Sequence, residues 1–202
     1  MAVSSSIDSF KAQVASDFAR PNLFQVDLAF PGKLNLGAGD KAAAGLTQLG
    51  QFTVRAANLP SSQMGVVEVP YRGRVLKIAG DRTFEPWTIT VMNDANFSLR
   101  FAFEQWVEAI QAANENYTAL ATLGDENDST GYFADMKVMQ LSRSSKQDKD
   151  GPKTVAEYKF YNVFPSNVSA IDLDFGSNDA IEEFTVELQV QYWQNITKGS
   201  ST

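Results

Sequence analysis

AGDRTFEPWTITVMND, residues 79–94, is the most informative stretch of this chain. Its apolar residues alternate with Thr88 and Thr90, and this period of two predicts a strand with one buried face. Asn93 and Asp94 follow where a helix would begin, because their side-chain oxygens can accept the free N–H groups of a first turn. The run therefore predicts a strand that passes through a short turn into a helix.

The same patterns predict that most of the chain is β structure. A Gly80-Asp81 turn should precede the strand just described. The substantial helix is expected at 95–117, with Leu99, Phe103 and Trp106 on its apolar stripe. A short helix is expected at 6–18, and further strands at 23–30, 52–57, 75–79, 133–142, 154–163, 168–175 and 182–193. Many strands with one covering helix predict a mainly β fold, a β-sandwich or barrel, as a single domain over residues 1–202.

Composition excludes several classes of function. The chain has no cysteine and no histidine, so it has no disulfides, no thiolate metal site and no imidazole general base. No apolar run reaches the roughly 20 residues of a membrane span, and the first residues do not form a secretory signal. We therefore expect assembly in the cytoplasm and no membrane insertion.

Charge is unevenly distributed along the chain. The net charge of −7 combines +2 over residues 1–100 with −9 over residues 101–202. Proteins that bind duplex DNA tightly need clustered cations that release counterions from phosphates. This chain is expected to repel DNA, which is useful where DNA must pass without binding.

Three further segments, together with residues 79–94, carry a family resemblance. They are DFARPNLFQVD at 17–27, LPSSQMGVVEVPYRGRVLKIAGDRTF at 59–84 and VFPSNVSAIDLDFGSNDAIEEFTVELQVQYW at 163–193. In this order they resemble the tail tube proteins of contractile-tailed bacteriophages, which are related to the tube proteins of contractile injection systems. Residues 33–50 and 124–131 depart from the family pattern and are predicted to be inserted loops.

The resemblance implies a structural role in the virion tail. Subunits of this family are implied to form hexameric rings whose strands join into a continuous barrel around a lumen, and the rings stack into an inner tube inside a contractile sheath. The implied partners are further copies of the chain, the sheath protein, the tape measure protein, and the baseplate and tail terminator proteins. DNA would pass through the lumen at ejection without specific binding, and no cofactor is implied.

The resemblance places the ring-contacting loop at residues 59–79. Apolar residues in this loop need a partner, and a dense group of cations accompanies them. If this loop contacts a different surface of a neighbouring copy, the contact joins unlike surfaces of identical chains, and such contacts produce stacks and filaments. The candidate stacking residues are Val66, Val67, Val69, Tyr71, Arg72, Arg74 and Lys77.

The last strand offers candidate residues for the lumen. Phe184, Val186 and Leu188 alternate there with polar residues, so one face should be dry and the other wet. The wet face would present few cations to DNA. The candidate lumen residues are Glu187, Gln189 and Gln191.

Three motifs that resemble chemical sites have simpler explanations. GAGDKA at 37–42 matches a dinucleotide fingerprint but lacks the βαβ context. DENDSTG at 125–131 begins like a calcium loop, yet Thr130 and Met136 stand where Gly and Glu are required. Asp172 and Asp174 could form a carboxylate pair, but on an alternating strand they are better explained as its polar face. No catalytic or metal residues are therefore assigned.

Two alternatives to a phage tube remain at this point. The first is the inner tube protein of a contractile injection system that delivers proteins. Neighbouring genes would distinguish the two, because capsid genes indicate a phage and toxin genes indicate an injection system. The second is a carbohydrate-active β-sandwich enzyme, which would need a carboxylate pair in an apolar pocket. Incubation with glycans tests that second alternative.

Overall fold

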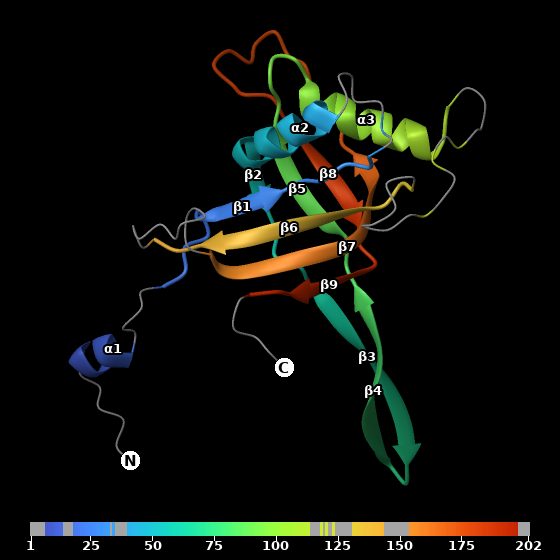
Figure 1. Cartoon of the computed structure of the whole chain (residues 1–202). Helices are drawn as coiled ribbons and strands as arrows, with labels where there is room; N and C mark the ends of the chain where they lie inside the picture. The colour runs from blue at the N-terminus through green and yellow to red at the C-terminus, as the bar shows by residue number, and fades with distance from the viewer. Residues whose placement is uncertain are drawn as a thin grey trace.

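The structure is a computed structural model that describes residues 7–13, 18–32, 34, 40–113, 118, 120, 123, 131–143 and 154–197. Two antiparallel half-sheets share one long strand, with two helices against them and a separate hairpin that projects away (Figure 1). The elements are α1 (Ile7–Gln13), β1 (Phe24–Asp27), α2 (Asp40–Thr53), β2 (Val54–Ala57), β3 (Ser62–Tyr71), β4 (Arg74–Phe84), β5 (Trp87–Met92), α3 (Ser98–Ile110), β6 (Ala134–Leu141), β7 (Thr154–Val168), β8 (Glu183–Gln189) and β9 (Tyr192–Asn195).

Strand β5 confirms the alternation predicted from the sequence. Trp87, Ile89 and Val91 are buried, and the threonines between them face outward. β5 pairs with β8, where Ile89 lies opposite Val186, so the two apolar faces form one continuous surface. The main sheet runs β1-β6-β7-β8-β5-β2, with β9 also paired to β7. One half-sheet consists of β1, β6, β9 and the first part of β7, and the other consists of β2, β5, β8 and the last part of β7.

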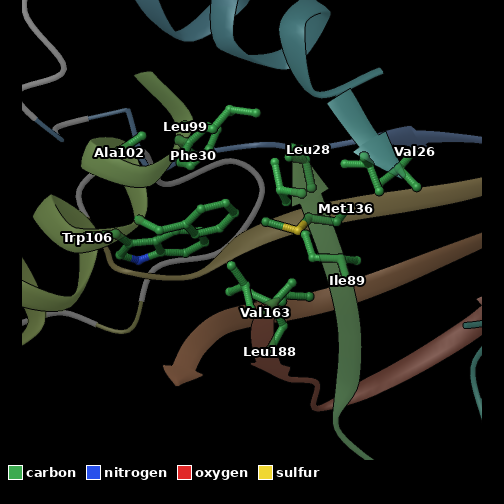
Figure 2. Packing of buried hydrophobic residues seen from close by; sticks show 14 of the residues in the cluster. Val26, Leu28, Phe30, Ile89, Leu99, Ala102, Trp106, Met136, Val163 and Leu188 are labelled. Atoms are coloured by element: carbon green, nitrogen blue, oxygen red, sulfur yellow. The ribbon is translucent and has the colours of Figure 1, made fainter. Parts of the chain in front are cut away.

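The core fills the space between the two half-sheets and the helices. Figure 2 shows side chains from β1, β5, β6, β7 and β8 converging with Leu99 and Trp106 of α3. Trp87 stacks on Phe160 with ring centroids 4.2 Å apart, which joins one half-sheet to the other. No described residue that is buried as a whole is polar or charged, so apolar burial is the main stabilising term.

Strand β7 is long because it serves both half-sheets. Its first part pairs with β6 and β9 and its last part with β8. The pairing with β6 shifts register between Ala134 and Met136, opposite Asn162, whose φ is +53°. The Asn162 N–H donates to Asp135 Oδ1 at 3.0 Å, which holds this bulge. A bulge bends a strand, and here it carries β7 from one half-sheet to the other.

Helix α3 covers the core as predicted, with shorter bounds. Asp94 Oδ1 accepts the Ser98 N–H at 2.8 Å, which satisfies one free N–H of the first turn, while the N-cap position itself is occupied by Phe97. Asn93 does not: its side chain donates to Glu182 at 2.8 Å. The helix spans 98–110 instead of 95–117, and residues 114–117 lie outside the described residues.

Several local predictions need correction. The loop prediction at 33–50 is wrong from residue 40, because α2 runs through Asp40–Thr53 and Thr47 Oγ1 ties it to the Leu28 carbonyl at 2.7 Å. The chain therefore has a second substantial helix. Residues 168–175 do not form a separate strand, since β7 ends at Val168. The inserted-loop prediction at 124–131 falls mostly outside the described residues, and so does the end of the helix predicted at 6–18. Within the described part of the chain, no helix is long and apolar enough to span a membrane.

Candidate functional site

The feature that stands out from the fold is the hairpin of β3 and β4. It extends from the end of the half-sheet where β5 begins and contacts little of the domain along its length (Figure 1). At its tip Arg72 has φ of +45° and Gly73 has φ of +83°. Two consecutive residues with positive φ are typical of the tight turn that matches strand twist. The prediction of a loop at 59–79 is therefore wrong in conformation, because the segment is a regular hairpin.

Both faces of the hairpin carry exposed apolar side chains. Val67 lies opposite Ile78 and Val69 opposite Leu76, so these four form one face. Leu76 is 61% exposed and Val69 41%. The other face holds Val66 and Val75 on either side of an ion pair in which Lys77 Nζ lies 3.5 Å from Glu68. An isolated two-stranded hairpin is marginal in water, and no other part of the chain that the structure describes covers these apolar faces.

Two glycines allow the strands of the hairpin to approach closely. A Cβ on Gly80 would lie 3.1 Å from the Gly65 carbonyl carbon, and a Cβ on Gly65 would lie 3.1 Å from the Asp81 carbonyl oxygen. The register shifts here, between Met64 and Val66. The predicted Gly80-Asp81 turn is therefore wrong: Gly80 permits a bulge within a continuous strand β4.

A cluster of aromatic residues and one cation fixes the base of the hairpin. The Arg82 guanidinium lies 4.8 Å from the Phe84 ring centroid and 5.1 Å from that of Trp193 on β9. Trp193 Nε1 also donates to the Ser61 carbonyl at 3.1 Å. These contacts tie the hairpin to β9, so its direction of projection is set by the domain. Sequence reasoning missed this cluster because Trp193 lies far from the hairpin along the chain.

The candidate stacking residues lie together on this hairpin. Val67, Val69 and Tyr71 share one face, and Val66 and Lys77 share the other. At the tip the Arg72 guanidinium lies 5.4 Å from the Tyr71 ring centroid, and Arg74 pairs with Tyr71 across the turn. The hairpin therefore carries apolar side chains along its two strands and cationic side chains at its tip.

The polar face of β8 holds two of the three candidate lumen residues. Glu187 and Gln189 lie outward on β8, and Glu187 is flanked by Thr88 of β5 and Asn167 of β7. Across β2, β5, β8 and residues 163–168, all of which are described, Arg55 is the one cation, and it is paired with Glu183. Gln191 does not share this face, because the strand predicted at 182–193 breaks after Gln189 and Gln191 donates its N–H to the Tyr161 carbonyl at 3.3 Å.

The remaining candidate for chemistry is the segment that joins β7 to β8. Asp172 and Asp174 are exposed there, outside any strand, so the prediction that they share a strand face is wrong. Asp174 Oδ1 accepts the Gly176 N–H at 2.9 Å, which is a turn contact. The residues that the structure describes include no group of three or more acidic residues arranged to hold a metal ion. Residues 37–39 and 125–130 of the other two motifs lie outside the described residues, residues 40–42 begin α2, and Met136 is buried in the core.

Comparison with known proteins agrees with this architecture. A family described as phage tail tube protein matches residues 19–196. The chain is 33% identical over 189 residues to the tail tube protein gp19 of Enterobacteria phage T4, which covers 93% of this chain and 98% of that protein.

Solved structures show the same fold at lower identity. A chain in the cryo-EM structure of the anti-feeding prophage cap, a tube terminating cap, has a TM-score of 0.56 at 17% identity and covers 91% of this chain and 97% of that one. A chain in the sheath-tube complex of the extracellular contractile injection system PVC has a TM-score of 0.50 at 15% identity, with 96% and 100% covered. With the family match spanning most of its length, the chain belongs to the phage tail tube protein family.

Proposed function

We propose that this chain assembles into hexameric rings that stack into the inner tube of a contractile phage tail, and that the tube conducts DNA at ejection. The family gives the structural tube role, and the hairpin carries the proposal for stacking. Its apolar faces are exposed along its length and rigidly directed by the Arg82–Trp193 cluster. Contact with a second ring would bury these exposed apolar side chains of the hairpin.

Ring closure would use the open edges of the sheets. β1 and β2 are the two ends of the main sheet, and among the described strands each pairs with a neighbour on one side only. Edge strands in stable proteins are covered or paired, and pairing with neighbouring subunits would continue the sheet around a lumen. The sheath, tape measure, baseplate and tail terminator proteins are the further partners of such a tube.

The lumen is proposed to be lined by the polar face that holds Glu187 and Gln189. This face has uncharged polar side chains, one unpaired carboxylate and no unpaired cation. Each phosphate that a cation neutralises steepens the fall of log affinity with log salt concentration by about 0.9, so a cationic lining would hold DNA. A lining without unpaired cations would let DNA slide. Gln191 is placed elsewhere and is not included.

A truncated hairpin tests the stacking proposal. Residues 66–79 are removed and Gly65 is joined to Gly80, which already lie side by side, so that a Gly-Gly turn closes the shortened hairpin. The base contacts of Arg82 and Trp193 are retained. The expected result is normal rings, a native circular dichroism spectrum and no long tubes by electron microscopy.

Normal tubes from the truncated chain would contradict the stacking role. A matched control is Val155→Thr, which changes an exposed apolar residue on β7 outside the hairpin and should leave tubes unchanged. Glycan hydrolysis by the purified chain would instead favour the carbohydrate-active alternative.

A further inference from the structure

The segment joining β7 to β8, residues 169–182 (the β7–β8 loop), is a second exposed apolar surface. Leu173 is 84% exposed, Phe175 is fully exposed and Ile181 is 67% exposed. Neighbouring residues of the loop are anchored, since Arg100 Nη1 donates to the Ser169 carbonyl at 2.8 Å and the Asn93 N–H to the Glu182 carbonyl at 2.8 Å. The loop is therefore held at both ends while its apolar side chains point into solvent.

This surface lies at the opposite end of the molecule from the hairpin tip. β5 begins at the hairpin base and ends beside Glu183, where the loop returns to β8. At about 3.3 Å per residue, β5 and β3 together span roughly 50 Å. Figure 1 shows the tip at one end of the molecule and the loop at the other, beyond α2 and α3.

The two ends carry opposite charge. Residues 170–183 hold Asp172, Asp174, Asp179, Glu182 and Glu183, and no Lys or Arg occurs between residues 160 and 197. Asp172, Asp174 and Asp179 form no ion pair with a described residue.

The hairpin carries the complementary group. At its tip, residues 69–76, the charged residues are Arg72 and Arg74 with no acidic residue among them, while Lys77 is paired with Glu68 on the opposite strand. Arg72 and Arg74 form no ion pair with a described residue, and Tyr71 beside them is 67% exposed. Both ends therefore combine unpaired charge with uncovered apolar surface, and the signs are opposite.

We propose that the β7–β8 loop is the receptor for the hairpin tip of a second copy of this chain in the next ring. This inference rests on the proposed stacking role of the hairpin. Leu173 and Phe175 cover Tyr71, while Asp172 and Asp174 pair with Arg72 and Arg74. A contact between unlike ends of identical chains is heterologous and repeats without closing. It therefore gives every ring the same polarity in the tube.

Charge reversal at each end, separately and together, tests this pairing. The tip variant carries Arg72→Glu and Arg74→Glu, and the loop variant carries Asp172→Arg and Asp174→Arg. Purified chains are assembled at low salt, and tube length is measured by negative-stain electron microscopy. Each variant alone should form rings but shorten tubes at least about tenfold, since opposed like charges in an interface weaken it strongly. The chain with all four substitutions should recover tube length.

The design separates this inference from the stacking role itself. Unchanged tubes from the loop variant, alongside short tubes from the tip variant, overturn the receptor assignment and leave the hairpin as the stacking element. So does a fourfold variant that fails to recover, because the loop would then face a different partner. Unchanged tubes from both the tip variant and the 66–79 truncation overturn the stacking role. Asp8→Arg with Glu108→Arg, at exposed sites on α1 and α3, matches the charge change of the loop variant and should leave tubes intact.

Discussion

The apolar face of the hairpin allows the strength of ring stacking to be estimated. Val69 and Leu76 are directly opposed on β3 and β4, and they are 41% and 61% exposed in the monomer. Full burial of a Val or Leu side chain is worth about 1.5–3 kcal/mol. Covering the exposed fractions of these two residues would therefore contribute roughly 2 kcal/mol per subunit contact.

The perturbation is Val69→Thr with Leu76→Thr. Threonine keeps a high preference for strands, so the hairpin should persist while most of the apolar contribution is lost. A loss of about 2 kcal/mol weakens each contact roughly thirtyfold. The loss is repeated at every subunit of a ring, so the concentration needed for tube growth should rise at least that much.

The assay is the critical concentration for tube growth, measured by sedimentation and checked by electron microscopy. Circular dichroism should show the same thermal unfolding as the unmodified chain, because neither residue contributes to the core. Val155→Thr serves as the matched control. An unchanged critical concentration in the double variant would refute the claim that this face is buried between rings.

Three further predictions concern stability, the hairpin bulge and the lumen. Ile89→Ala, at a fully buried position on β5, should cost about 2–5 kcal/mol of unfolding free energy in denaturant titration, and a cost below ~1 kcal/mol would contradict the core assignment. Gly80→Ala should shorten tubes because its Cβ would lie 3.1 Å from the Gly65 backbone. Gly45→Ala, with open space around it in α2, should instead raise stability by about 0.5–1 kcal/mol. Equal effects of the two substitutions on tube length would count against the bulge. Glu187→Lys with Gln189→Lys should permit assembly but slow DNA ejection more at low salt than at high salt, and unchanged ejection at low salt would show that this face points away from the lumen.

Local patterns predicted the regular parts of the fold. The alternation around Ile89 gave β5 correctly because a strand with one buried face leaves a period of two in the sequence. The stripe of Leu99, Phe103 and Trp106 gave α3 for the equivalent reason at helical spacing. The Asp94 carboxylate accepts a free N–H of the first turn of α3 as predicted, since such a contact joins residues close in sequence, although the helix begins only at Ser98 with Phe97 as its N-cap.

Features that depend on distant residues were not predictable in this way. The Ala- and Gly-rich segment before β2 has a weak apolar stripe, yet it forms α2 because it packs over β1 near Leu28. Gly80 looked like a turn, but its role is the close approach to Gly65 across the hairpin. The bend of β7 at Asn162 depends on a hydrogen bond that the Asn162 N–H donates to Asp135 of another strand.

The same distinction between local patterns and distant contacts applies to the candidate site. The apolar and cationic residues of the hairpin could be selected from the sequence because they are dense and local. Their arrangement on two faces required the register of β3 and β4. The separation of Gln191 from Glu187 required the break between β8 and β9, where the backbone turns to pair with Tyr161.

Cryo-electron microscopy of the purified chain under assembly conditions would show whether rings form and whether they stack through the hairpin. We expect hexameric rings stacked into a tube, with the β3–β4 hairpin of each ring buried against the next ring. Particles that remain monomeric at high concentration, or tubes in which the hairpin is solvent-exposed, would contradict it.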